Sequence, residues 1–366
     1  MLKTPVLTVS PFERGGEKRP PFKGGTGRVL YIDLAKGICI FLVVLDHIAG
    51  NGYFDGGNYP MNDIFEQTRM PLYFILSGLF FKDYAGGIRE FLLRKANRIL
   101  IPYLFFMALY RVSAKAVWLL TGIGIGDVWA PLWFLLCLFW MNIVFATLYY
   151  IVKRCAPSGW TSDTMLGIAV VGIGIAGYYA GNLPLNIGTA MTSLPFLWMG
   201  FLLNRRLHIF QQRISWWWAL LSAIVLFMAL HYLYMGDNFF YLNAYNAPLP
   251  LVYLCGLMGT LAILMLSRVI RWLPVISYIG RYSIIVLCTH MAVLKAILAV
   301  LRLLSESDGE PFWTGLWLSN DAQSWTVLAL TVAGCTFCCW LLSRYLPWFT
   351  AQKDLIKICC CPVNSA

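Results

Sequence analysis

Apolar stretches of about 20 residues recur along nearly the whole chain and alternate with short polar segments. About 20 apolar residues of α-helix are needed to cross the hydrocarbon core of a bilayer. The pattern therefore predicts an all-α polytopic integral membrane protein with about ten transmembrane helices. We expect them at 30–50, 70–82, 99–121, 129–152, 165–182, 187–203, 215–235, 250–268, 282–303 and 324–346.

Polar residues at the two ends of the chain set the domain boundaries. Residues 1–29 form a predicted flexible cytoplasmic tail, residues 30–346 the transmembrane domain, and residues 347–366 a cytoplasmic C-terminal tail. With both termini in the cytoplasm, most of the 28 Lys and Arg residues fall in cytoplasmic segments, as the positive-inside rule requires. Arg69 is the only base that this topology assigns to an outer loop.

The composition supports this fold class and excludes several other kinds of protein. Charged residues make up only 12% of the chain, whereas soluble domains usually carry about 25%. The net charge of +11 comes from bases in short loops, so we expect membrane lipid and no nucleic acid as a partner. The sequence has no Walker A loop, His-Glu-x-x-His motif or Gly-x-Ser-x-Gly motif, and we expect no metal. It leaves open whether the protein forms a homo-oligomer.

Eleven cysteines do not form a recognisable disulfide framework, because most lie in predicted spans. Cys335-x-x-Cys338 resembles a metal or redox motif, but it lies within a span and has no second pair, so we interpret these thiols as apolar side chains. The final Cys359-Cys360-Cys361 is open to thiol modification, metal capture or a loose tail without a role.

The span at 30–50 holds four ionisable residues, Asp33, Lys36, Asp46 and His47. An ionisable group inside a span costs about 2.5–3.5 kcal/mol on insertion scales and usually marks a pathway or a site. Lys36 and His47 are eleven residues apart, which places them on one helix face about 16 Å apart along the axis. Asp33 lies on the same face. We therefore expect this face to point toward protein or water and away from lipid.

His47 suits a general base for a hydroxyl group, because the unperturbed pKa of histidine is near neutrality. Asp46 points about 100° away from it on a helix and is not required to orient it. Lys36 would hold an anionic group in an internal cavity. The alternatives are a buried structural histidine and a lysine that extends to the membrane interface. The shared face of the two residues favours function.

Arg94, Lys95 and Arg98 lie at the cytoplasmic end of the span at 99–121. Lys95 and Arg98 are one turn apart on one predicted helix face. Such a pair suits the phosphates of a nucleotide-bearing donor, although an ordinary positive-inside anchor would look the same.

Three other segments carry candidate residues. Arg69 breaks the charge rule, so we expect a specific partner for it, such as a carboxylate or a developing oxyanion. Ser77-Gly78 would allow close helix approach. His290 follows a helix start and is open to a structural or a functional role. The aromatic and amide-rich outer loop 236–249 could bind a sugar, but an interfacial aromatic belt is favoured.

The motifs resemble those of membrane acyltransferase family 3, in particular its fucose 4-O-acetylase-like branch. The resemblance extends over about residues 28–345 and includes the layout of ten spans. Its two more specific motifs are Asp33-Leu-Ala-Lys36-Gly37 followed by His47, and Arg69-Met-Pro-Leu-Tyr-Phe-Ile-Leu-Ser77-Gly78. Weaker matches are Lys95-x-x-Arg98-Ile with Pro102, Pro131-Leu-Trp133-Phe-Leu135, and Gly280-Arg-Tyr-Ser283 with His290.

The resemblance implies a bacterial inner-membrane enzyme that moves an acyl group, commonly acetyl from acetyl-CoA, onto a hydroxyl of a cell-envelope glycan. It implies that Lys36 and His47 are essential and that Lys95 and Arg98 contact acyl-CoA. The sequence departs from many relatives because it has no acidic residue near Trp133 and no soluble esterase-like domain.

Residues and resemblance together give one hypothesis. Acyl-CoA enters at the cytoplasmic bases, and His47 and Arg69 face a glycan or lipid-linked sugar on the outer side. His47 then takes the hydroxyl proton or first carries the acyl group. The alternative is a transporter or flippase without covalent chemistry. Transporters are often built from internal repeats, and the Asp33–His47 pattern has no second copy, which disfavours this alternative.

Overall fold

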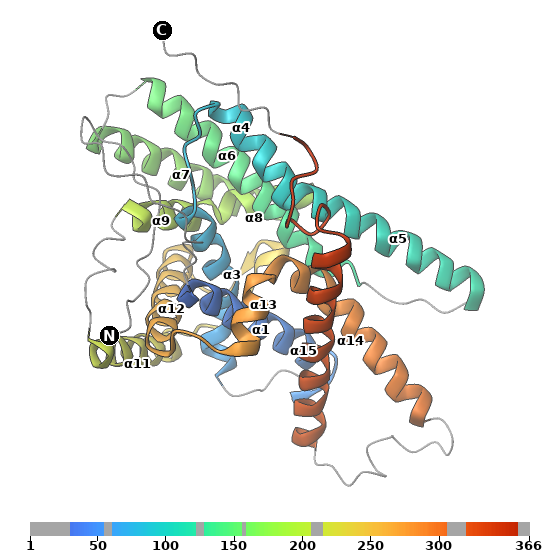
Figure 1. Cartoon of the computed structure of the whole chain (residues 1–366). Coiled ribbons are helices and arrows are strands. Elements are labelled where there is room, and N and C mark those ends of the chain that lie inside the picture. Colours follow the sequence, from blue (N-terminus) through green and yellow to red (C-terminus); the bar gives the residue numbers. More distant parts are fainter. Residues whose placement is uncertain are drawn as a thin grey trace, which may run out of the picture.

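A computed structural model describes residues 30–54, 61–121, 128–155, 159–205, 215–305 and 320–357 of the chain. Helices make up nearly all of this part (Figure 1). One short antiparallel hairpin, β1 (Asn238–Phe239) with β2 (Ala244–Tyr245), lies in the connection before the helix that begins at Leu249. The helices are α1 (Leu30–Ala49), α3 (Asn62–Leu79), α4 (Gly87–Lys95), α5 (Ile101–Thr121), α6 (Trp133–Cys155), α7 (Trp160–Ala180), α8 (Ile187–Thr192), α9 (Leu194–Arg205), α11 (Trp216–Tyr232), α12 (Leu249–Ile270), α13 (Pro274–Arg281), α14 (Ser283–Ser305) and α15 (Asn320–Tyr345).

The all-α membrane fold is confirmed. In the described part of the chain, six helices are long and apolar enough to cross a membrane. A seventh span results if the pair Pro184–Thr192 and Leu194–Asn204, bent by 49°, is counted as one. Each of the ten predicted ranges contains a helix, but α1 and α3 carry several charged residues and α11 has only 17 residues. The count of ten spans therefore remains a prediction.

The predicted boundary of the second span is wrong. The helix α3 begins at Asn62, eight residues before the predicted start at 70, and continues through Pro71. The polar segment before Pro71 looks like a loop in the sequence, but Glu66, Gln67 and Thr68 are buried against other elements. Arg69 consequently lies inside a helix and not in an outer loop.

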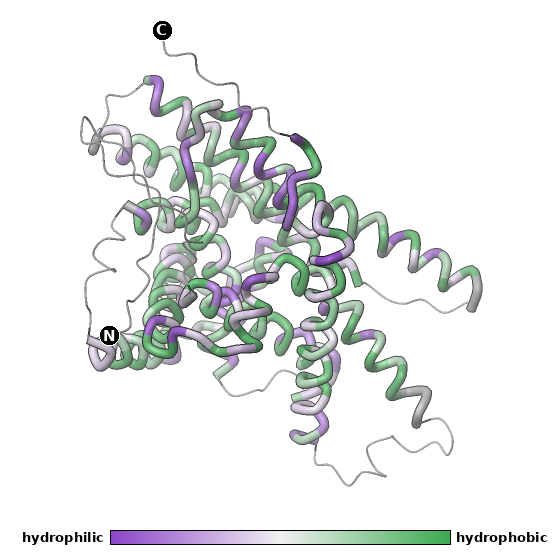
Figure 2. The backbone as a smooth tube through the Cα atoms, viewed as in Figure 1, coloured by the Kyte–Doolittle hydropathy of each residue, from purple (hydrophilic) through white to green (hydrophobic). Residues whose placement is uncertain are grey.

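Hydrophobic residues dominate the helices, whereas hydrophilic residues gather on α4 and on the C-terminal segment beside it (Figure 2). Large apolar side chains on α5, α7 and α11 are exposed, among them Val112, Ile168 and Trp218. Exposed apolar helix faces are what a bilayer would cover. The buried core, in contrast, includes several fully buried phenylalanines: Phe74, Phe91, Phe106, Phe145 and Phe196.

The helix α1 packs against α13 at two glycines. A Cβ atom on Gly37 would lie 1.9 Å from the carbonyl oxygen of Ile276, and one on Gly280 would lie 1.9 Å from that of Asp33. Both contacts are with backbone, which cannot rotate away as a side chain can. The same close approach occurs between α3 and α9 at Gly78 and Gly200, as expected for the Ser77-Gly78 pair.

We expect Gly280→Ala to destabilise the protein, because the added methyl group forces α1 and α13 apart. Overpacking of this kind costs about 1–3 kcal/mol. Thermal unfolding in detergent should shift downward by several degrees. Gly172→Ala is the matched control, since no atom lies within 4 Å of its Cβ position. Equal unfolding temperatures for the two variants would contradict this account of the contact.

The helices α1 and α14 run side by side in the same direction. Gly280, just before α14, contacts Asp33 and Gly37. Ten residues further along each segment, the rings of His47 and His290 are 5.1 Å apart. One turn later, Lys295 Nζ donates to Asn51 Oδ1 at 2.8 Å. This alignment places the ionisable residues of α1 against those of α14.

The C-terminal segment packs against the beginning of α5. The buried Asn97 lies in a π-helical turn, Ala96–Leu100, between α4 and α5. Its Oδ1 accepts from the backbone N–H groups of Leu355 and Ile356, and its Nδ2 donates to the carbonyl of Ile356 at 2.9 Å. Phe349 stacks on Phe105 with ring centroids 4.5 Å apart. Residues 346–357 are thus held as a strap across the α4–α5 junction. Cys359-Cys360-Cys361 and the N-terminal 1–29 lie outside the described residues.

Asn97→Ala is expected to release this strap, because it leaves two backbone donors and one carbonyl without their partner. Each of these hydrogen bonds contributes about 0.5–1.5 kcal/mol. Trypsin should then cleave after Lys353 at least about tenfold faster than in the wild type, since cleavage follows the population of the open form. Gln352→Ala, which removes an exposed side chain from the same segment, should not change the cleavage rate. An unchanged rate in Asn97→Ala would show that the strap is held by other contacts.

Candidate active site

The two ends of α1 carry the residues that the sequence singles out. Lys36 lies over the ring of Phe80, with Nζ 5.0 Å from the centroid. His47 packs against His290 of α14. Lys36, Asp46 and His47 are all half-buried within the helix bundle. The polar face of α1 is therefore directed at protein, as the spacing predicts.

Asp46 and His47 have different neighbours, as expected for adjacent residues on a helix. Arg69 Nη1 of α3 lies 2.8 Å from Asp46 Oδ1. The Arg69 side chain is only 12% exposed, and its nearest other carboxylate is Glu66 at 4.0 Å. The sequence predicts a carboxylate or a developing oxyanion as the partner of Arg69, and the contact in the structure is with the carboxylate of Asp46. The guanidinium neutralises Asp46 on one side of α1, and His47 faces α14 on the other.

The acidic cluster around Arg69 continues into the connection between α11 and α12, which carries the hairpin. Glu66 Oε1 accepts from the backbone N–H of Asn238 at 3.2 Å. The Tyr234 hydroxyl donates to Asp237 Oδ1. Hydrogen bonds from the Glu66 carboxyl and then from Tyr234 hold the pKa of the Asp237 carboxyl below its usual range. Two carboxyls in hydrogen-bond contact share one proton, because two bare carboxylates would repel.

The sequence analysis did not single out Glu66 and Asp237. Glu66 precedes Arg69 by three residues, and that spacing on a helix would have indicated a contact if the helix start had been known. Asp237 lies in the loop 236–249, where the aromatic and amide residues drew the interpretation and the carboxylate did not. That loop is joined to α3 beside Arg69, so its polar groups belong to the same cluster.

Asn51 and Lys295 were also missed. Asn51 Nδ2 donates to the backbone carbonyl of His47 at 2.6 Å, and Lys295 donates to Asn51. These contacts pin the last turn of α1 to α14. The available signal was Lys295 itself, a base well inside the predicted span at 282–303.

The side chains of Lys95 and Arg98 contact different groups in the structure. Lys95 is half-buried, lies over the ring of Phe91 at 5.3 Å and is close enough to Lys36 to feel its charge. Arg98 points elsewhere, because its Nη1 donates to the carbonyl of Ala351 at 2.6 Å and its Nε lies 3.5 Å from Asp354. The prediction of one shared face is wrong because the π-helical turn widens the helix after Lys95.

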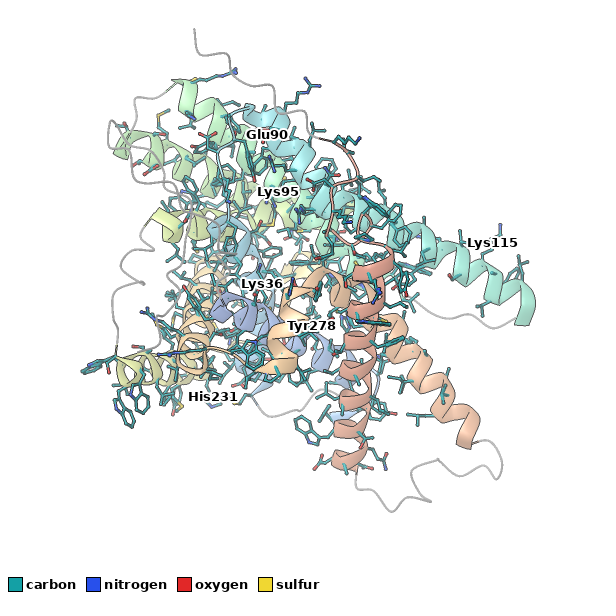
Figure 3. The ribbon with its side chains drawn as sticks, viewed as in Figure 1. Lys36, Glu90, Lys95, Lys115, His231 and Tyr278 are labelled. Atoms are coloured by element: carbon teal, nitrogen blue, oxygen red, sulfur yellow. The ribbon has the colours of Figure 1, made fainter. Side chains whose placement is uncertain are left out.

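Lys36 and Lys95 are thus two half-buried cations that lie near each other. Figure 3 shows Lys36 near the middle of the bundle and Lys95 toward α4. Arg94, by contrast, is bound to Glu90 at 2.6 Å and lies over the ring of Tyr84.

The remaining predicted residues lie in packing contacts. Ser77 Oγ and Asn142 Nδ2 are 3.2 Å apart and join α3 to α6. Trp133 packs edge-on against Phe134, whose ring stacks on Phe74. Asp33 is in the first turn of α1, where its backbone approaches Gly280. These residues support the helices that carry the site.

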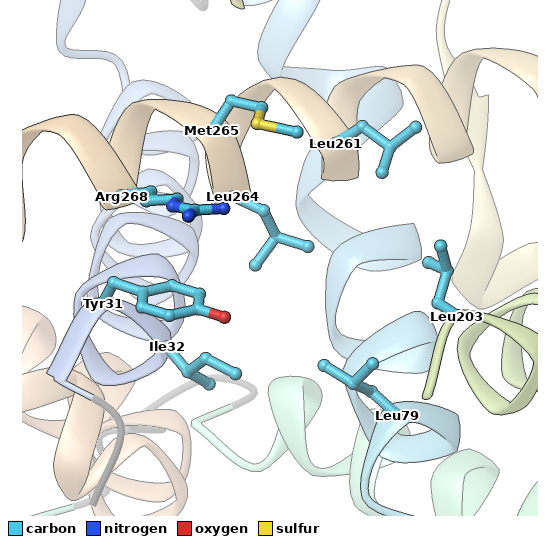
Figure 4. Close-up of a pocket in the computed structure, with 8 residues that line it drawn as sticks. All are labelled: Tyr31, Ile32, Leu79, Leu203, Leu261, Leu264, Met265 and Arg268. Carbon is cyan, nitrogen blue, oxygen red and sulfur yellow. The ribbon is translucent and has the colours of Figure 1, made fainter. Parts of the chain in front are cut away.

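A small cavity lies between α1, α3, α9 and α12 (Figure 4). Its volume of about 30 Å³ corresponds to one water molecule. Leu79, Leu203 and Leu264 give it apolar walls, with Tyr31 and Arg268 as its polar residues. It is too small to hold a nucleotide-bearing donor. Among the described residues, no group of three or more His, Cys, Asp or Glu is arranged to hold a metal ion.

Comparison with known proteins adds one finding. A family model described as an acyltransferase domain matches residues 29–344, which span α1 to the end of α15. No curated protein matches the chain, and no solved structure does. The matched range includes both ends of α1, the Arg69 cluster and α14.

Proposed function

The chain belongs to acyltransferase family 3, and from this premise we propose that it is an O-acyltransferase of the bacterial inner membrane. We propose acetyl-CoA in the cytoplasm as the acyl donor. The proposed acceptor is a hydroxyl of a cell-envelope polysaccharide or lipid-linked sugar. Membership of an acyltransferase family favours covalent transfer over a transporter or flippase.

The placement of His47 is the observation that supports this proposal most. The ring is half-buried between helices, and in the described part of the chain neither ring nitrogen has a hydrogen-bond partner. A free ring nitrogen inside a membrane domain is available to take or give a proton. On the other side of the same helix turn, Arg69 provides a positive charge.

The proposed reaction uses these groups as follows. His47 takes the proton of the acceptor hydroxyl while the hydroxyl oxygen bonds to the carbonyl carbon of the thioester. The carbon–sulfur bond then breaks, and coenzyme A leaves as a thiolate that receives the proton from His47. In the second route, the His47 nitrogen bonds to the acyl carbon first, the carbon–sulfur bond breaks and coenzyme A leaves as a thiolate. The hydroxyl oxygen then displaces the His47 nitrogen from the acyl carbon, and the hydroxyl proton passes to the thiolate. Both routes end in an ester and free coenzyme A, and both need His47.

Lys36 and Lys95 are proposed to hold the donor phosphates. The two cations lie close enough to repel each other, and a bound anion would relieve that repulsion. Lys36 is about 16 Å from His47 along α1, a distance that leaves room for an extended donor arm between phosphates and thioester.

The experiment that tests this function is transfer of label from radioactive acetyl-CoA to the glycan fraction of membranes that express the protein. Membranes with the empty vector and with His231→Gln, an outer residue that contacts Asp63, are the controls. We expect label with the wild type and His231→Gln and none with the vector. No label with the wild type, in membranes shown to contain acceptor, would contradict an acetyl donor.

A further inference from the structure

His290 makes a hydrogen bond that defines the state of its ring. Its Nδ1 lies 2.9 Å from the backbone carbonyl of Val286, one turn earlier on α14. A carbonyl accepts only, so Nδ1 must carry the proton. In the neutral ring the other nitrogen, Nε2, is then an acceptor with a free lone pair.

Among the described residues, that acceptor has no partner. Nε2 of His290 is fully buried and makes no hydrogen bond with any of them, and the residue as a whole is 1% exposed. A buried polar atom without a partner costs about 1–3 kcal/mol. An unpartnered buried nitrogen on a histidine is therefore a candidate for a positioning or catalytic role.

His47 is the neighbouring side chain that can donate a hydrogen bond to Nε2 of His290. The two ring centroids are 5.1 Å apart with the planes tilted by 34°. Thr289, the preceding residue, faces α15 through a hydrogen bond with Cys335, which leaves His290 facing α1. At this separation, a rotation of the His47 ring brings one of its nitrogens within hydrogen-bond reach of Nε2.

The backbone of His47 is meanwhile held still. Asn51 binds its carbonyl, and Lys295 of α14 binds Asn51. Movement of the histidine is therefore limited to its side-chain torsions. The two helices keep the rings at contact distance while the rings reorient.

We propose that His290 is a positioning residue whose Nε2 accepts a hydrogen bond from a ring N–H of His47. This fixes the tautomer of His47, because the nitrogen that donates to His290 carries the proton and the other keeps its lone pair for the acceptor hydroxyl. When His47 takes the hydroxyl proton, the same hydrogen bond stabilises the imidazolium until the proton passes to the leaving thiolate. This role rests on the proposed function, but the hydrogen bond needs only rotation of the His47 ring and forms without substrate.

The test is ¹⁵N NMR of histidine-labelled protein, which has only four histidines. In the wild type, we expect His47 to be a single neutral tautomer with a scalar coupling across the hydrogen bond to His290 Nε2. His290→Phe removes the acceptor and should leave His47 as a mixture of tautomers. His290→Gln, whose amide oxygen can accept, should restore the single tautomer. His231→Gln is the control and should leave the His47 signals unchanged.

Kinetics provide the second measurement. Loss of an orienting partner typically costs about 10- to 100-fold in activity. In His290→Phe we expect this loss in kcat with the KM for acetyl-CoA unchanged, and partial recovery in His290→Gln. No coupling in the wild type, or the same His47 tautomer in His290→Phe as in the wild type, would overturn the proposal even if acyl transfer is observed. Absence of acyl transfer with the coupling present would instead overturn the proposed function alone.

Discussion

His47→Gln is expected to reduce acyl transfer by at least about 100-fold, because general acid–base catalysis contributes about 10²- to 10⁴-fold. Glutamine retains hydrogen-bonding capacity and similar size, but its amide neither takes up a proton nor forms an acyl adduct under these conditions. The variant therefore removes both routes that we describe. The measurement is the initial rate of label transfer from acetyl-CoA in membranes with matched protein levels.

The control for this variant must show that the site is still assembled. His231→Gln makes the same replacement at an exposed outer position and should keep the wild-type rate. His47→Gln should also keep the thermal unfolding temperature of the wild type, since the backbone contact with Asn51 does not depend on the ring. Transfer above about a tenth of the wild-type rate in a folded His47→Gln protein would be incompatible with either route.

Lys36→Met should raise the KM for acetyl-CoA by about 10- to 100-fold, since a charged hydrogen bond to a phosphate contributes about 1.5–3 kcal/mol. Methionine keeps the length and apolar stem of lysine, so the packing on Phe80 is largely retained. The measurement is initial rate against acetyl-CoA concentration.

Lys115→Met is the matched control for Lys36→Met. Lys115 is exposed on the far part of α5, away from Lys36 (Figure 3). Its replacement should change neither kcat nor KM. A KM for acetyl-CoA equal to that of the wild type in Lys36→Met would mean that Lys36 does not bind the donor. The proximity of Lys36 and Lys95 would then have another role.

The sequence predicted the parts of the site that depend on a single helix. Lys36 and His47 lie in one unbroken α-helix, so their spacing alone placed them on the protein-facing side of α1. The family resemblance also rested on local motifs, and the family match over 29–344 confirms the family, whereas the fucose 4-O-acetylase-like branch stays a prediction. Hydropathy identified the fold class because the lipid environment requires long apolar helices.

What escaped prediction depends on contacts between helices. The polar start of α3 looks like a loop until Glu66, Gln67 and Thr68 are seen to be buried. The π-helical turn that separates Lys95 from Arg98 has no sequence signal that we could use. The contact of His47 with His290 joins residues more than 200 positions apart, and only the close approach of α1 to α13 at Gly37 and Gly280 brings them together.

The most direct test of the central claim uses sealed inside-out membrane vesicles, which expose the cytoplasmic face. Radioactive acetyl-CoA is added outside, where it reaches only that face, and label is counted on glycan enclosed in the vesicle lumen. The account predicts labelled glycan with the wild type and a background count with His47→Gln. Equal label in the two, or label that stays on the cytoplasmic face, would contradict transfer through a site at His47.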